Sequence, residues 1–391
     1  MLRQLINRSK DIKKLHNEGY SLSINQGHLI IEDIPYVNSN KEIKTGTLIS
    51  KLATSGGIAR YDNQHVVYFI GEQPCFSDGT EIDSIKHVVA ATTHMSGIIS
   101  SRSFSNKPND GYRDYYHKMV TYINILANQA KVINPSSTAC LFKPIVDDNN
   151  PEDVFEYFDT NSSRADILVL TEVFKSHRVG IIGLGGTGSY ILDFVAKTQV
   201  AEIRLFDADT FHTHNAFRSP SATNIEQLES MQSKVEYFKK QYSNMHKYIN
   251  ANNVYITEDN LNLLDGLDFV FISIDKSAIK PALFDYLEAN NIEYIDVGLG
   301  LSVVKNKIRG SVRCTPVFNG NKDFRKEIPI VDDENDLYGT NIQIAELNAI
   351  NASMAVMQWK RHLGFYHNFT GDSNTVYNID TGGMVYTDVG A

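Results

Sequence analysis

The sequence predicts an α/β protein, with a small α+β domain over residues 1–150 and a doubly wound, mainly parallel sheet over residues 151–391. Three observations support this. A chain of 391 residues is too long for one ordinary core, so two domains are expected. Apolar segments of strand length alternate with helical stretches in the second part of the chain. A polar stretch, residues 147–153, separates the two parts.

The first part carries the signals of a small α+β domain. Residues 65–70 form a run of strand-forming side chains, followed by turn signals at Gly71 and at residues 78–79. Within residues 112–132, apolar side chains recur at intervals of three and four, which predicts a helix.

The second part contains five short apolar segments. They are residues 179–182, 203–206, 254–256, 269–274 and 294–297. Because these segments are apolar on both faces and helical stretches separate them, we expect parallel strands covered by helices on both sides. A later apolar stripe between Ile344 and Met357 has helical spacing and is expected to pack in the core.

Composition narrows the possible functions. The formal net charge of −9 argues against a general nucleic-acid-binding protein, which needs clustered Lys and Arg. The sequence has no apolar run of about 18 residues, so neither a membrane-spanning helix nor a membrane partner is expected. The N-terminus lacks the features of a secretory signal, and three cysteines without a C-x-x-C pair cannot form a disulfide framework. A cytoplasmic protein is therefore expected.

A glycine-rich loop follows the first strand of the second part. Gly183, Gly185 and Gly188 fit G-x-G-x-x-G, with Gly186 between them, and a helix is expected over residues 189–197. Such glycines let backbone N–H groups approach phosphate oxygens at a helix N-terminus, as in Rossmann-like folds. Asp207, at the end of the next strand, is placed to bind a ribose. A nicotinamide dehydrogenase and an adenylating enzyme fit these features equally well.

The residues that follow separate the two possibilities, because they resemble the ubiquitin-activating and ThiF/MoeB-type adenylyltransferase family. In that family the second strand ends in Asp-x-Asp followed by Asn and Arg, a later helix carries Lys-Val-Glu, and a further strand ends in Asp. The matching positions are Asp207, Asp209, Asn215, Arg218, Lys234 and Asp275. Ser219 replaces the family's usual Gln, and Lys276 replaces its usual Asn.

The resemblance implies that the protein binds ATP and Mg²⁺ and transfers AMP to a carboxylate. Arg218 and Lys234 would place positive charge on the polyphosphate, and Asp275 would hold Mg²⁺. Asp207 would bind the ribose, Asp209 would belong to the nucleotide-binding site, and Asn215 would donate hydrogen bonds to the triphosphate. Hydride transfer requires neither cation, so these residues favour adenylation over dehydrogenation.

The same family carries an arginine upstream of the first strand that reaches into the nucleotide site of a partner subunit. Arg164 lies at a similar place, although its spacing to Gly183 is shorter than usual. If Arg164 has this role, the enzyme works as a homodimer. The alternative is an arginine that is solvated or ion-paired on the surface.

Ubiquitin-activating enzymes pass the acyl group from AMP to a cysteine. Cys314, followed by threonine, resembles the family's catalytic Cys-Thr, but residues 310–314 also form a strand pattern that would bury it. The sequence leaves both alternatives open. Cys75, on an expected surface loop, is a second candidate, and Cys140 is expected in the core. Zinc is not expected, because the paired C-x-x-C motifs of many ThiF/MoeB relatives are absent.

Two further groups suggest metal ligands but have simpler explanations. His212 and His214 flank Asn215 without a third ligand nearby, so exposed or packing histidines are expected. The acidic residues 332–336 are expected to form a solvated loop.

The first domain supports a narrower hypothesis. Residues 104–108 and 111–119 resemble the N-terminal extension of ThiF-like proteins from bacterial ubiquitin-like conjugation operons, some of them antiphage. The resemblance implies activation of a ubiquitin-like protein. We expect this domain to recruit that protein or a conjugating partner, or to buttress the dimer. Alternatives are adenylation of a sulfur-carrier protein or of an RNA-borne carboxylate without a thioester, or an inactive nucleotide-binding scaffold.

Overall fold

The computed structural model describes residues 2–94, 97–146, 153–275, 278–318, 323–330, 342–369 and 371–388. The chain forms two compact units, Met1–Val146 with Phe158–Ala165 and Asp147–Tyr157 with Asp166–Ala391. The expected boundary at 147–153 lies outside the described residues except for Asp153, as do Lys276 and the acidic residues 332–336. Within the described ranges, no helix is both long and apolar enough to cross a membrane.

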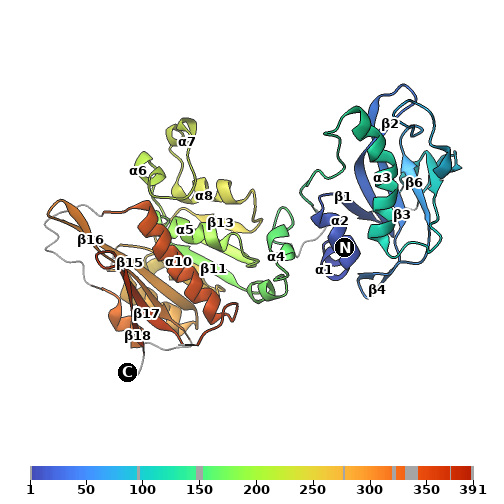
Figure 1. Ribbon diagram of the computed structural model, residues 1–391. Helices are drawn as coiled ribbons and strands as arrows, with labels where there is room; N and C mark the ends of the chain where they lie inside the picture. Colours follow the sequence, from blue (N-terminus) through green and yellow to red (C-terminus); the bar gives the residue numbers. More distant parts are fainter. Residues whose placement is uncertain are drawn as a thin grey trace. The chain divides into compact units, whose positions relative to one another are not determined.

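The smaller unit is a six-stranded antiparallel sheet with one long helix, α3 (Tyr115–Ile133), lying across a face (Figure 1). In sheet order its strands are β1 (Ser21–Asn25), β2 (His28–Val37), β3 (Ile43–Lys51), β6 (Val66–Ile70), β10 (Arg102–Ser105) and β7 (Lys86–Val88). Helices α1 (Leu2–Arg8) and α2 (Lys10–Asn17) precede them. Asp114 caps α3 by accepting the His117 N–H at 2.7 Å. The predicted strand at 65–70 and helix at 112–132 are confirmed.

The larger unit is built on an eight-stranded sheet. In sheet order its strands are β13 (Ile249–Asn252), β12 (Glu202–Phe206), β11 (Arg178–Ile182), β14 (Phe269–Ile272), β15 (Glu293–Val304), β16 (Lys307–Val317), β17 (Ser373–Asn378) and β18 (Gly383–Asp388). The first five are parallel, and β15 to β18 are antiparallel. The order of the parallel strands reverses between β11 and β14, which confirms the predicted doubly wound fold.

Helices cover both faces of this sheet (Figure 1). Those on one face are α5 (Gly186–Val195), α8 (Lys234–Tyr242) and α10 (Ala345–His362), and the other face holds α9 (Lys280–Ala289) and the 3-10 segment η3 (Glu258–Leu264). Trp359 of α10 is wholly buried against Phe174, Phe269 and Phe271. Burial on both sides explains why the central strands are uniformly apolar.

Three predicted strands differ from the structure in their bounds. Residues 254–256 do not form a strand; β13 lies earlier, at the sheet edge, where it pairs with β12 alone and needs fewer apolar side chains. The strand predicted at 269–274 ends at Ile272, so that Ser273 and Ile274 leave the sheet. The strand predicted at 294–297 continues as β15 to Val304, because β16 pairs with it along its length.

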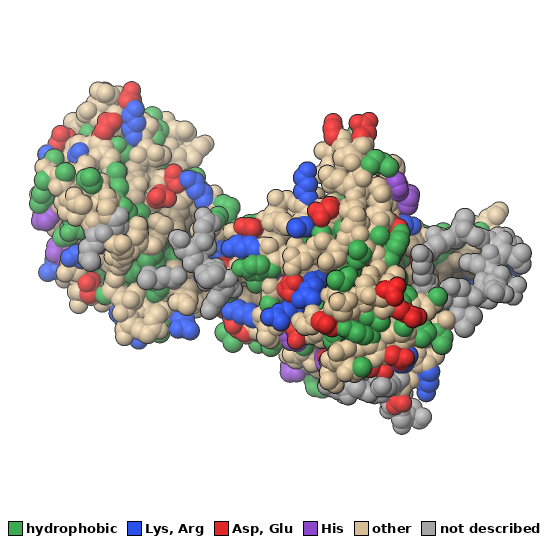
Figure 2. Space-filling view, turned by 180° about the vertical axis from the view of Figure 1, so that it is seen from behind, with side chains coloured by type: hydrophobic (Ala, Val, Ile, Leu, Met, Phe, Trp, Pro, Cys, Tyr) green, Lys and Arg blue, Asp and Glu red, His purple; other side chains and the backbone are tan. Residues whose placement is uncertain are grey.

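The formal net charge of the sequence is −9, and the surface carries both basic and acidic side chains. On the face of each unit seen in Figure 2, Lys and Arg side chains are interspersed with Asp and Glu. This distribution differs from the clustered basic surface of a protein that binds nucleic acid through its phosphates.

An ion pair at the end of α10 predicts a pH-dependent contribution to stability. His362 Nε2 lies 2.8 Å from Glu293, and its Nδ1 lies 3.8 Å from Asp372. Burial lowers the pKa of His362, but its interactions with Asp372 and Glu293 outweigh this effect and raise the pKa to about 9. Because this value exceeds the unfolded value of about 6.5, the stabilisation is fully present below pH 6.5 and lost as the pH rises through about 9.

We therefore expect the stability difference between wild type and His362→Gln to shrink by at most about 3 kcal/mol between pH 6 and pH 10. Urea unfolding across this range measures it. Parallel pH profiles for the two proteins would contradict the assignment.

Candidate functional site

A cavity of about 270 Å³ lies at the carboxyl ends of β11 and β14. The chain leaves these neighbouring strands in opposite directions, toward β12 on one side and β15 on the other. Crevices at such a reversal of strand order are the usual ligand sites of open α/β sheets. The fold therefore places the cavity where a nucleotide would be expected.

The loop between β11 and α5 depends on its glycines. Gly183 has a φ of +87°, and a Cβ there would lie 2.3 Å from the Ser273 carbonyl oxygen. A Cβ on Gly188 would lie 1.9 Å from the Gly183 carbonyl oxygen. This close packing brings the start of α5 to the cavity, where Gly185 and Gly186 form part of the lining. The first N–H groups of a helix lack intrahelical partners and suit a phosphate.

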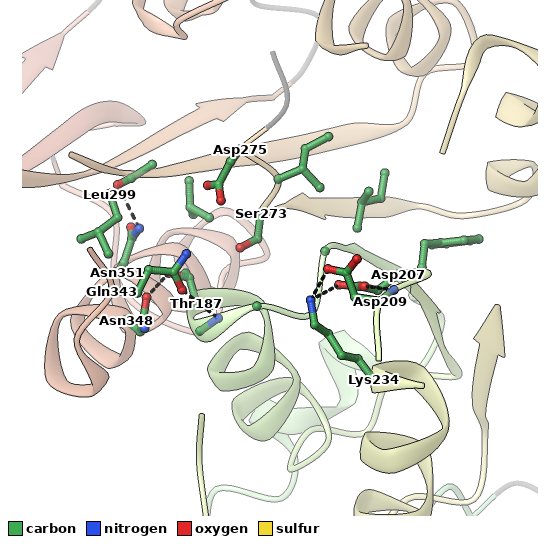
Figure 3. A pocket seen from close by; sticks show the side chains of 18 of the residues that line it. Thr187, Asp207, Asp209, Lys234, Ser273, Asp275, Leu299, Gln343, Asn348 and Asn351 are labelled. Carbon is green, nitrogen blue, oxygen red and sulfur yellow. Dashed lines mark hydrogen bonds and ion pairs between the residues drawn. The ribbon is translucent and has the colours of Figure 1, made fainter. Parts of the chain in front are cut away.

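Asp207 joins this loop to two other segments. One of its oxygens accepts the Leu184 N–H at 2.7 Å, and the other accepts the Asp209 N–H at 2.8 Å. The buried Lys234, at the start of α8, lies 3.4 Å from Asp207 and 2.6 Å from Asp209 (Figure 3). Tyr255 donates a further hydrogen bond to Asp209. Two acids and a lysine thus lie together at one side of the cavity. Lys234 was expected to place its charge on a polyphosphate, and here it is ion-paired with both acids.

Two buried hydrogen-bond donors lie close to this cluster. The Asn215 side-chain oxygen accepts the His212 N–H at 2.9 Å, which leaves its Nδ2 buried without a partner among the described residues. The same holds for Nε of Arg218, which lines the cavity. Burial lowers the pKa of the Arg218 guanidinium, while Asp275 and Asp209 act in the opposite direction. Unmet donors on desolvated groups favour an anionic ligand, because leaving them unpaired costs roughly 1–3 kcal/mol each.

Asp275 is an exposed carboxylate just beyond β14, and it lines the cavity together with Ser273 (Figure 3). Mg²⁺ in nucleotide sites is commonly held by one or two carboxylates, water and the phosphates themselves, so a single acid at this place fits the ion. No cluster of three or more acidic, His or Cys ligands occurs in the described ranges. His212 and His214 are both exposed, in line with the simpler explanation for them.

The structure brings nearly all the predicted nucleotide-binding residues to one place. The cavity lining includes Gly183, Gly185, Gly186, Asp207, Asp209, Arg218, Lys234 and Asp275. Gly188 packs against the lining residue Gly183, while Asn215 is not among the lining residues.

Sequence analysis missed three carboxamide side chains near the start of α10 that also line the cavity. Gln343 accepts the Gly186 N–H at 3.3 Å. Asn348 accepts the Thr187 hydroxyl at 3.0 Å, and Asn351 donates to a backbone carbonyl at 3.0 Å. These residues lie within or beside the apolar stripe. Leu347 and Met354 of the stripe are in the core as predicted, whereas Met357 is 49% exposed, so its expected core position is wrong. The sequence did offer one signal for these site residues, namely three carboxamide side chains within or beside an otherwise apolar helical stripe.

Arg164 lies in the smaller unit, at the end of α4 (Thr160–Arg164). Its Nη2 donates to the Asn17 carbonyl at 3.0 Å, and the guanidinium lies over the Phe142 ring. These contacts match the alternative of a surface arginine. A role in a partner subunit's cavity remains a prediction.

The cysteines lie away from the cavity lining. Cys314 is wholly buried in β16 within the core, and burial raises the pKa of its thiol, so the structure favours a packing role for this residue. Cys75 is also wholly buried and bridges Val37 and Glu81, so the expectation of a surface loop is wrong. Cys140, expected in the core, is only half-buried.

Models of two protein families match this sequence, one in each part of the chain. The model described as "ThiF family" matches residues 163–383, more than half of the chain. The model described as "Domain of unknown function (DUF6791)" matches residues 10–160. The tRNA threonylcarbamoyladenosine dehydratase of Haemophilus influenzae is 27% identical over 131 residues, 33% of this chain and 49% of that protein. The chain thus spans about half the length of this curated relative.

Two solved structures from E. coli resemble the fold at low sequence identity. MccB crystallised with MccA-N7isoASN has a TM-score of 0.48 and 16% identity, covering 78% of this chain and 95% of that chain. The tRNA N6-threonylcarbamoyladenosine dehydratase TcdA in complex with AMP has a TM-score of 0.38 and 16% identity, covering 52% and 93%.

The glycine loop allows a matched pair of substitutions. Gly188→Ala would force its Cβ against the Gly183 carbonyl, and we expect a loss of about 1–3 kcal/mol in unfolding free energy. At Gly185 the nearest atom to a new Cβ is 4.0 Å away, so Gly185→Ala should change stability by less than about 0.5 kcal/mol. Denaturant unfolding tests both. Equal stability of the two variants would contradict the packing described.

Thiol labelling tests the placement of the cysteines. In the native protein we expect Cys140 to react with iodoacetamide well before Cys75 and Cys314, because their burial limits both access and thiolate formation. Mass spectrometry of peptides from timed samples reports each site. Fast labelling of Cys314 under native conditions would restore it as a thioester candidate.

Proposed function

We propose that this chain, which belongs to the ThiF family, is an ATP-dependent adenylyltransferase that activates a carboxylate. The observation that carries the proposal is a pair of buried donors without a partner among the described residues, Arg218 Nε in the cavity lining and Asn215 Nδ2 three residues before it. They suit the phosphates of ATP, while Asp207 at the end of β12 suits the ribose hydroxyls. Hydride transfer by a dehydrogenase does not require a cation such as Arg218 at this place.

In the proposed reaction, a carboxylate oxygen forms a bond to the α-phosphorus of ATP. The bond from that phosphorus to the oxygen bridging to the β-phosphate breaks, and its electron pair leaves with pyrophosphate. Arg218 and the N-terminus of α5 would stabilise charge on the phosphates, and Lys234 would hold Asp207 and Asp209 in position. Mg²⁺ held by Asp275 would neutralise charge on the departing pyrophosphate.

The acyl substrate we propose is the C-terminal carboxylate of a ubiquitin-like protein, in a bacterial antiphage conjugation pathway. The motif from Asp207 to Asp275 and the N-terminal domain support this choice. The acyl group would then pass to a thiol. Because Cys314 is wholly buried, we place that thiol on a conjugating partner. The enzyme would act in the cytoplasm as a homodimer, with Arg164 completing the partner's site.

A second candidate is adenylation of an RNA-borne carboxylate. It is favoured by the 27% identity to the Haemophilus tRNA threonylcarbamoyladenosine dehydratase. The net charge of −9 and the interspersed surface charges count against an RNA substrate.

ATP–pyrophosphate exchange tests the proposal. With a ubiquitin-like protein encoded beside this gene as substrate, we expect exchange that Arg218→Ala and Asp275→Asn each reduce by about 100-fold or more, since each removes charge stabilisation at the phosphates. Lys197→Ala is the matched control, because Lys197 is an exposed cation just beyond the end of α5 and is paired with Asp193. It should leave exchange unchanged.

Parallel reactions with total tRNA separate the second candidate from the first. Absence of exchange with every carboxylate substrate, together with hydride transfer from NADH, would contradict adenylation.

A further inference from the structure

The cavity extends beyond the glycine loop to a second side, where α10 faces β15. In Figure 3, Asn351 and Leu299 lie on the side opposite Asp207 and Lys234. If the ribose binds at Asp207 and the phosphates at the start of α5, this second side is where the acyl substrate approaches.

Asn351 is a buried polar residue of the cavity lining that the phosphate chemistry does not explain. Its side chain is 0% exposed, and its Nδ2 donates to the Gly298 carbonyl at 3.0 Å. Because a carbonyl can only accept, this bond fixes which end of the carboxamide is nitrogen. Oδ1 is then a buried acceptor without a partner in the described part of the chain. Such an acceptor costs roughly 1–3 kcal/mol unless a donor reaches it.

The unmet groups in and near the cavity differ in character. Asn215 Nδ2 and Arg218 Nε are donors, which suit phosphate oxygens. Oδ1 of Asn351 is an acceptor, and it would repel phosphate or carboxylate oxygens. The group that fits it is an N–H carried by the acyl substrate itself.

The backbone beside Asn351 suits an extended peptide. Strand β14 pairs with β15 only as far as Ile272 opposite Asp296. From Val297 to Val304, β15 pairs with β16 on its other side, and Val297, Gly298 and Leu299 line the cavity. Among the described residues, this edge of β15 carries no neighbouring strand. An open strand edge can bind an extended chain through main-chain hydrogen bonds.

We infer that Asn351 Oδ1 accepts the N–H of the last peptide bond of the acyl substrate, next to the carboxylate that becomes adenylated. The inference rests on the proposed function and adds a residue that would recognise the last peptide bond of its substrate. A carboxylic acid without this N–H would leave the acceptor unpaired and bind less well.

An ester substitution tests the contact directly. A semisynthetic carrier protein is made in which oxygen replaces the N–H of the last peptide bond, and kcat/KM for pyrophosphate exchange is compared with that of the native carrier. We expect the wild-type enzyme to lose about 10-fold or more with the ester carrier, because the acceptor stays unpaired. Asn351→Leu should use both carriers with similar efficiency, while its KM for ATP stays unchanged.

Gln358→Leu is the matched control. Gln358 is a buried carboxamide on the same helix, and its Oε1 is also unpartnered among the described residues, but it lies outside the cavity lining. This variant should still discriminate against the ester carrier as wild type does.

The outcomes distinguish a failure of the Asn351 contact from a failure of the proposed adenylation function. Wild-type exchange that is equal with both carriers overturns the role of Asn351, whether or not Asn351→Leu folds. A difference between carriers that persists in Asn351→Leu also overturns it. Absence of exchange with the native carrier removes the proposed function, and this inference with it.

Discussion

The site depends on one buried carboxylate, that of Asp207. Its two oxygens accept the backbone N–H groups of Leu184 and Asp209, and Lys234 lies beside it. A charge buried to this degree is stable only when such partners surround it. The same interactions fix the glycine loop, the end of β12 and the start of α8 relative to one another. The positions of the groups that would contact the phosphates therefore depend on this carboxylate and its partners.

A second buried carboxylate organises the other side of the sheet. Asp296 of β15 is wholly buried and lies 2.8 Å from Lys280 and 2.6 Å from Arg313. These interactions tie α9 and β16 to β15 directly beneath the cavity segment that begins at Val297. Each side of the cavity thus has a buried acid with cations from neighbouring elements, so the reacting groups would be held by rigid parts of the fold.

The glycine loop and Asp207 could be predicted from spacing, and Lys234 and Asp275 from a family resemblance, but the residues that α10 contributes to the site could not. Gly183 and Asp207 follow apolar strands directly, so their chemistry is visible from spacing alone. Asn351 is more than 140 residues from Asp207, and only the packing of α10 against β15 brings it to the cavity. The burial of Cys75 likewise depends on its bridges to Val37 and Glu81. The edge strand β13 was misplaced because an edge position demands little apolar character.

The central claim is that a carboxylate oxygen attacks the α-phosphorus of ATP in this cavity. The most direct measurement uses a carrier whose C-terminal carboxylate is labelled with ¹⁸O and follows the label by mass spectrometry after thiol transfer. Adenylation predicts AMP that carries one ¹⁸O atom from the carrier, because the C–O bond breaks when the thiol attacks. Unlabelled AMP, or ADP as the nucleotide product, would contradict it.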